Sequence, residues 1–448
     1  MGVDTSKASQ ESSTADRPSS HTSRTVSTAS VRRLLLRVVL AALVVRLIVV
    51  CFVYPGFLAP GREHWEFGYE AGKIARSIVL GHGFGNPYYG GDTGPTAMLP
   101  PIFPYLLAGV MALFGIYTKA SALVMLSLNS LVSALICVPI FFAARRSFGI
   151  RVARWTAWTW AFFPYAVYFS ADSIWYRSLI TLFVTLLLLV TLQLETSTHL
   201  WAWAGYGFLA GVAALIDPVA LAALPFLGGW ACYRLYQRRR NWIAPALTAA
   251  AVVFVTVAPW LIRNYRVFHR PVFLRDGFPQ AFLVGNAGNS VHWWNGLKDP
   301  SGNAAEMAEF RRVGEQAYMA EKWASVFALI KSNPWGIAWR SVRRFLYMWT
   351  GYWSFNREYL QEEPFDPANI VFATPFTCLA LIGLRKAFGN ALRAAVPFAL
   401  MLLSLPIVYY ITTPHLAYRH PLDPEIVMLA MYTVCSWFPT RRAIAANM

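Results

Sequence analysis

The sequence contains repeated apolar stretches of roughly 20 residues whose ends carry arginine, proline or tryptophan. As a helix, a stretch of that length crosses the hydrocarbon core of a bilayer, which is about 30 Å thick. Backbone inside lipid has to satisfy its hydrogen bonds internally, and a helix does so within one segment. The pattern therefore predicts an all-α polytopic membrane protein.

The composition agrees with this fold class. Only 14% of the 448 residues are charged, 56% are apolar and the mean hydropathy is +0.42, whereas a soluble domain carries about 25% charged residues. The net charge of +17 does not indicate a nucleic-acid partner, because many basic residues lie in short clusters at the ends of apolar stretches. The positive-inside rule accounts for such clusters.

Basic clusters also predict the orientation of about ten spans. Arg32, Arg33 and Arg37 precede the first span, which holds the N-terminus in the cytoplasm and puts the following loop outside. Arginines at 145–154 and 234–240 mark the cytoplasmic ends of later spans, in agreement with this orientation. The expected spans are 34–54, 120–144, 155–171, 178–194, two that meet outside at Asp217 and Pro218, 242–262, 368–384, 391–412 and 424–438.

Four regions follow from this topology. Residues 1–31 are rich in serine and threonine and are expected to form a disordered cytoplasmic tail. Residues 32–262 form the transmembrane core and include a first extracytoplasmic loop, 55–119. Within that loop the apolar stretch 102–116 is short for a crossing and has prolines at its head, which favours an interfacial or re-entrant helix. Residues 263–367 form a long extracytoplasmic region, and 368–448 hold the last spans and a cytoplasmic C-terminus.

Carboxylates gather in the outside loops. Glu66 and Glu70 follow the first span and are four residues apart, so they share one face of any helix there. They are candidates for a general base or a metal ligand, and the alternative is a solvated helix face. Asp172 lies in a short outside turn and is a candidate for the same cavity. Asp217 precedes a proline and is interpreted first as a cap or turn residue.

Two basic positions lie at the outer membrane edge. Arg419 and His420 precede the last span, and arginine suits fork-like recognition of a phosphate whose lipid tail stays in the bilayer. The alternative is an interfacial arginine that reaches ordinary headgroups. Arg263, at the exit of the span 242–262, is a second candidate donor, with a routine helix-end anchor as its alternative.

The order of these motifs resembles the GT-C superfamily of membrane glycosyltransferases, of the protein mannosyltransferase and aminoarabinose transferase type. The resemblance covers nearly all of the chain from about residue 34. It is carried by motifs that follow one another in the family's order: Glu66-Phe-Gly-Tyr69-Glu70, Gly81-x-Gly83-Phe84, Pro100-Pro101-x-x-Pro104-Tyr105, Ala144-Arg145-Arg146-x-Phe148-Gly149, Pro259-Trp260-x-x-Arg263-Asn264 and Tyr418-Arg419-His420-Pro421.

The resemblance implies an inverting transfer of a sugar from a polyprenyl-phosphate donor to a lipid, glycan or protein acceptor on the outer face. The family's acidic pair in the first loop is altered here, because Trp65 replaces the expected aspartate. Glu66 and Glu70 are therefore rival bases, and Glu70 is favoured because it opens a helix. Asp172 matches the second acidic position and Arg419 the contact to the carrier phosphate.

Further expectations come with this resemblance. Donors with a single phosphate need no metal in this family, so we expect no cofactor and no divalent ion. The expected location is the bacterial plasma membrane, with the active site on its outer face. Two other functions remain as alternatives: a transporter or lipid flippase without chemistry, and a non-catalytic scaffold that binds a partner through residues 263–367.

Overall fold

The computed structural model describes residues 28–57, 66–288, 291–364 and 366–438. In these ranges the regular elements are helices, apart from an isolated β-bridge between Gly85 and Pro95. The helices that match expected spans are α1 (Thr28–Phe57), α4 (Lys119–Leu135), α5 (Cys137–Phe148), α6 (Ile150–Phe162), α7 (Pro164–Ala171), α8 (Arg177–Leu194), α9 (Leu200–Ile216), α10 (Leu224–Gln237), α11 (Ile243–Phe268), α17 (Asp366–Gly389), α18 (Ala395–Ser404), α19 (Ile407–Ile411) and α21 (Asp423–Trp437). The all-α prediction is confirmed.

Several expected spans are pairs of helices. Prolines explain two of the breaks, since proline has no N–H to donate and clashes with the preceding turn: Pro164 separates α6 from α7, and Pro406 precedes α19. In the described part of the chain, five helical segments are long and apolar enough to cross a membrane, namely 28–52, 119–148, 177–194, 243–268 and 366–389. Shorter apolar helices lie at 102–114, 200–216 and 395–411.

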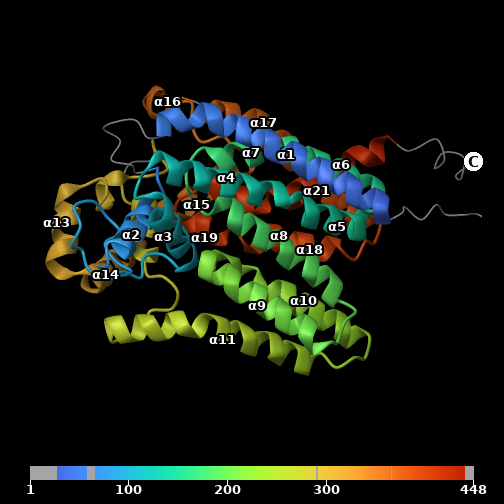
Figure 1. Cartoon of the computed structure of the whole chain (residues 1–448), viewed down its shortest axis with the longest axis horizontal. Coiled ribbons are helices and arrows are strands. Elements are labelled where there is room, and N and C mark those ends of the chain that lie inside the picture. Colours follow the sequence, from blue (N-terminus) through green and yellow to red (C-terminus); the bar gives the residue numbers. More distant parts are fainter. Residues whose placement is uncertain (1–27, 58–65, 289–290, 365, 439–448) are drawn as a thin grey trace, which may run out of the picture.

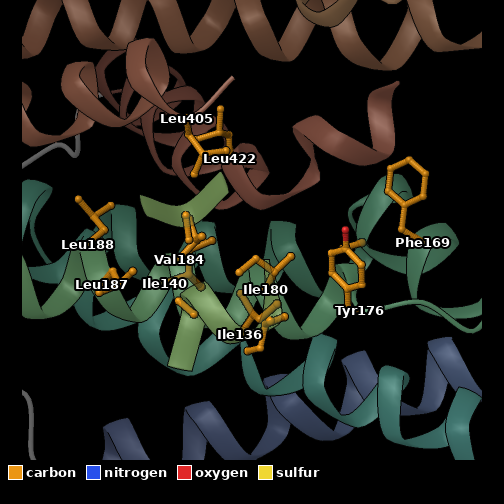
Figure 2. Close-up of a cluster of buried hydrophobic side chains, with 14 of the residues drawn as sticks. Ile136, Ile140, Phe169, Tyr176, Ile180, Val184, Leu187, Leu188, Leu405 and Leu422 are labelled. Carbon is orange, nitrogen blue, oxygen red and sulfur yellow. The ribbon is translucent and has the colours of Figure 1, made fainter. Parts of the chain in front are cut away.

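The apolar core joins helices from the first half of the chain to the segment just before α21. Ile180 and Val184 of α8 are buried between Ile136 and Ile140, at the α4–α5 junction, and Leu422 near the start of α21 (Figure 2). Burial of this kind ties the C-terminal segment to the N-terminal helices, so residues near 420 are held close to residues near 175.

The two ends of the bundle differ in character (Figure 1). At one end lie the loop helices: α2 (Tyr69–Val79), α3 (Ile102–Phe114), α12 (Phe278–Asn286), α13 (Ala304–Val313), α14 (Glu315–Ser332), α15 (Pro334–Thr350) and α16 (Arg357–Glu362). The short α20 (Leu416–Arg419) follows α19 in the chain. The short 3-10 helices η1 (Pro218–Ala222), η2 (Gly296–Lys298) and η3 (His420–Leu422) complete the described elements.

The opposite end carries the basic clusters. There α1 begins and α21 ends (Figure 1), and Glu195 forms ion pairs with Arg146 at 3.4 Å and Arg234 at 3.7 Å. Clusters that the sequence assigns to one side of the membrane are thus brought together in space. Which side of the cell membrane this end faces remains a prediction.

Candidate active site

A cavity of about 470 Å³ opens among the loop helices. Its volume falls in the range of roughly 300–1,000 Å³ that is typical of small-molecule sites. The walls come from five parts of the chain: the loop between α1 and α4, the residues just before α8, η1, the long region after α11 and the segment before α21. The side chains with polar atoms or aromatic rings include Glu70, Trp175, Tyr176, Arg275, Gln280, Trp293, Trp294, Asp299, Tyr409 and Tyr418.

Glu70 supplies a carboxylate to this cavity from the first turn of α2. The preceding Gly68 has a φ of 94°, a left-handed conformation that favours glycine. Burial and, as the next contribution, the negative charge of Asp299 raise the pKa of Glu70 to about 7, and Arg275 opposes both. A carboxyl with a pKa near neutrality can accept a proton from a bound substrate.

Arg275 faces the same cavity from the segment between α11 and α12. Burial alone would lower the pKa of its guanidinium, but Tyr176 and Asp217 favour the charged form and the net shift is upward. Within the described residues no hydrogen bond or ion pair to this guanidinium is seen, although Asp217 lies in its electrostatic range. Its donors are therefore available to an anionic ligand in the cavity.

Asp217 itself is a capping residue. Its Oδ1 accepts a hydrogen bond of 3.1 Å from the N–H of Val219, and it is the N-cap of η1. The Tyr409 hydroxyl donates to the other oxygen at 3.5 Å. The interpretation of Asp217 as a cap is confirmed.

Asp172 and Glu66 lie together behind one wall of the cavity. Arg177 donates to Asp172 at 2.7 Å, and the N–H of Ile174 donates to the carbonyl oxygen of Glu66 at 3.2 Å. The ring of Tyr69 contacts that of Trp175, a cavity residue, with 5.1 Å between centroids. The structure thus brings Glu66 and Asp172 to one place, while Glu70 is the acid that lines the cavity.

Arg419 and His420 point into the helix bundle. Asp423 lies 3.2 Å from the Nε of Arg419 and 2.8 Å from the Nδ1 of His420, and all three side chains are buried. Arg419 also donates to the carbonyl oxygen of Met348 at 3.1 Å. Neither residue lines the cavity, although the neighbouring Tyr418 does. The expected meeting of Arg419 with Glu70 is not found, because a buried guanidinium requires a close counter-charge and Asp423 provides it.

Arg263 holds the first outside loop against α11. Its guanidinium donates to the carbonyl oxygens of Thr96 at 2.7 Å and Phe84 at 2.8 Å, and it stacks on the ring of Trp260. These contacts occupy its donors with backbone. The placement agrees with the alternative reading of Arg263 as an anchor and gives it no contact with the cavity.

Sequence reasoning missed Arg275 and Asp299. Both lie in the region 263–367, where many basic and acidic residues have no pattern that separates a cavity residue from a surface one. A weak signal existed at Arg275-Asp276-Gly277-Phe278-Pro279, where a turn leads into a helix with proline in its first turn. Within the described residues, no group of three histidine, cysteine, aspartate or glutamate side chains has the geometry to hold a metal ion.

Comparisons with known proteins bear on this cavity and its helices. Residues 99–262 match the family of dolichyl-phosphate-mannose-protein mannosyltransferases. A comparison with curated proteins found no match. The oligosaccharyltransferase of Archaeoglobus fulgidus in its apo form has a similar structure, with a TM-score of 0.54 and 13% identity over 92% of this chain and 52% of that one.

Two further structures extend the comparison. The same archaeal enzyme, AglB, in complex with an inhibitory peptide and a dolichol-phosphate, gives a TM-score of 0.52 and 14% identity, over 93% of this chain and 52% of that chain. ArnT from Cupriavidus metallidurans bound to undecaprenyl phosphate gives a TM-score of 0.39 and 16% identity, over 91% and 78% of the two chains, a score that by itself establishes no shared fold.

The chain spans about half of the archaeal oligosaccharyltransferase, and the likeness covers nearly all of this chain. The match to the mannosyltransferase family lies within the same helices and includes Asp172 and Arg177. The family match over residues 99–262 and the fold shared with the archaeal oligosaccharyltransferase both agree with the resemblance to the GT-C superfamily of membrane glycosyltransferases.

Proposed function

We propose that the chain transfers a sugar from a polyprenyl-phosphate donor to an acceptor hydroxyl or amine on the extracytoplasmic face. The observation that carries this proposal is the cavity in which Glu70 and Arg275 occur together. One is a buried carboxyl with a pKa of about 7, and the other is a guanidinium that no described residue pairs with. Such a pair fits a reaction that takes up a proton at one point and releases an anion at another.

The proposed reaction is a single displacement. Glu70 accepts the proton of the acceptor O–H or N–H, and that oxygen or nitrogen forms a bond to the anomeric carbon of the sugar. The bond from this carbon to the phosphate oxygen breaks, and its electron pair leaves with the polyprenyl phosphate. Arg275 stabilises the negative charge that develops on the phosphate. Attack from the face opposite the phosphate inverts the anomeric configuration.

The aromatic lining supports a sugar substrate. Tyr176, Tyr409, Tyr418, Trp175 and Trp293 surround the cavity, and such rings offer apolar faces with polar edges. Glu66 and Asp172 act from behind this wall in the proposal, because Asp172 fixes Arg177 and Tyr69 contacts Trp175. The structure of archaeal AglB that resembles this chain is a complex with a dolichol-phosphate, a ligand of the proposed donor's class.

A transfer assay tests the proposal. Purified protein in lipid vesicles is given a polyprenyl-phosphate sugar together with candidate acceptors, and the release of free polyprenyl phosphate is measured. We expect release by the wild type and a loss of about 100-fold or more in Glu70→Gln. Exposed Glu321→Gln, on α14, serves as the matched control. Equal release by wild type and Glu70→Gln contradicts the proposal.

A further inference from the structure

Asp299 is a second acid in the wall of the cavity, and hydrogen bonds fix its position. Its Oδ2 accepts from the Nε2 of Gln280 at 2.6 Å. Its Oδ1 accepts from both the N–H and the hydroxyl of Ser301, at 2.8 and 2.5 Å. Both oxygens of Asp299 thus accept hydrogen bonds, and no cation is paired with this carboxylate among the described residues.

The partner of Asp299 is fixed as well. Gln280 lies on α12 and is only 4% exposed, and its side-chain amide is hydrogen-bonded to the Tyr88 hydroxyl at 3.1 Å. Tyr88 belongs to the first outside loop, which also carries Glu70 on α2. The hydrogen-bonded series Tyr88–Gln280–Asp299 therefore connects the region 263–367 to the first loop and fixes the position of the Asp299 carboxylate.

We propose that Asp299 is a positioning residue for the Glu70 base: its fixed negative charge disfavours the ionised form of Glu70 and so makes Glu70 a stronger proton acceptor. This inference rests on the proposed function. Two like charges in one low-dielectric cavity oppose each other's ionisation. Asp299 accepts three hydrogen bonds, whereas no side chain among the described residues is seen to donate to the Glu70 carboxylate, so the repulsion acts on Glu70.

Other charged and titratable groups also face Glu70. Arg275 acts in the opposite direction, since its positive charge favours the ionised carboxylate. Tyr88, Tyr176 and Tyr418 lie within electrostatic range of Glu70 from the first loop, the start of α8 and α20. Burial is the largest contribution to the raised pKa of Glu70, and Asp299 is the next. Among these groups Asp299 is the other carboxylate in the wall of the cavity.

The pH dependence of transfer tests the proposal. Glu70 has to be ionised to act as a base, so kcat/KM rises with pH through its pKa. In Asp299→Asn the rise moves to lower pH, by about one pH unit, and kcat on the plateau falls because the base is weaker. Asp299→Glu keeps the charge and leaves the rise near its wild-type position. Exposed Asp92→Asn, in the first loop, is the control for a lost carboxylate outside the cavity.

A second variant, Asp299→Ser, removes the same charge and retains a hydroxyl that can bond Gln280. Size-exclusion profile and Tm report whether each variant folds. If kcat/KM of either folded variant rises over the same pH range as in the wild type, the proposal is overturned. Failure of both variants to fold means that Asp299 serves the fold alone, and overturns it too. Absence of transfer by the wild type, in contrast, contradicts the proposed function itself.

Discussion

Glu70 and Arg275 line the same cavity, although one comes from the first loop and the other from the segment after α11. The bundle produces this meeting: Arg263 fastens the first loop to α11 through the carbonyl oxygens of Phe84 and Thr96. The N–H of Asp276, next to Arg275, donates to the carbonyl oxygen of Ala97 at 3.2 Å. Backbone contacts thus place an acid and a guanidinium on one cavity without joining them as an ion pair.

The raised pKa of Glu70 predicts a stability change that needs no substrate. An acid whose pKa is higher in the folded state than in the unfolded state stabilises the fold fully at low pH, and this contribution is lost as pH rises through the folded value. For Glu70 the loss develops between the ordinary pKa of 4.5 and the raised value of about 7, and it is complete above that value. We expect Glu70→Gln to raise Tm at pH 9, by the equivalent of about 3 kcal/mol at most, and to leave it unchanged at pH 4. A Tm difference that is the same at both pH values contradicts the assignment.

Loss of the Arg275 guanidinium should weaken donor use. A hydrogen bond to a charged group contributes about 1.5–3 kcal/mol, so Arg275→Gln should lower kcat/KM for the polyprenyl-phosphate sugar by roughly 10- to 100-fold. Arg275→Lys retains the charge and should recover part of the lost kcat/KM. Arg266→Gln, at an exposed position on α11, is the control. The proposal is wrong about Arg275 if Gln and Lys variants both match the wild type.

Arg419 should behave as a structural residue. Its guanidinium is 1% exposed and faces Asp423 at 3.2 Å, and removing one member of a buried pair costs about 3–5 kcal/mol. We expect Arg419→Ala to lower Tm strongly, and the folded fraction to bind polyprenyl phosphate like the wild type. Exposed Arg393→Ala should change neither quantity. A normal Tm together with a loss of polyprenyl-phosphate binding would instead support the contact to the carrier phosphate that the sequence suggested for Arg419.

Transfer should not require a divalent ion. In the proposed mechanism Arg275 supplies positive charge where the phosphate leaves and the donor carries a single phosphate, so we expect equal rates with and without EDTA. A rate that falls in EDTA and recovers with Mg²⁺ or Mn²⁺ would show that an ion takes part.

The sequence predicted those features that local chemistry determines. Apolar stretches located the helices, and Pro164 marks the break between α6 and α7. The shared helix face expected of Glu66 and Glu70 is not formed, because α2 begins at Tyr69 and leaves Glu66 before it. Glu70 was favoured because it opens a helix, and α2 begins at Tyr69. Orientation, domain boundaries relative to the membrane and the roles of these acids remain predictions.

Features that depend on tertiary contacts were not predictable. Whether Arg419 reaches the cavity depends on Asp423, which lies on the same helical face one turn later and draws the guanidinium inward. Arg275 and Asp299 reach the cavity because α12 and the turn at Ser301 bring them there. No spacing in the sequence marks either residue, because their neighbours in space come from other loops.

A structure of the protein with bound polyprenyl phosphate tests the central claim most directly. The quantity to measure is the distance from the phosphate oxygens to the guanidinium nitrogens of Arg275 and of Arg419. We predict a hydrogen-bond distance of about 3 Å to Arg275, with the phosphate in the cavity that Glu70 lines. A phosphate bound at Arg419, or anywhere away from the Glu70 cavity, would contradict it.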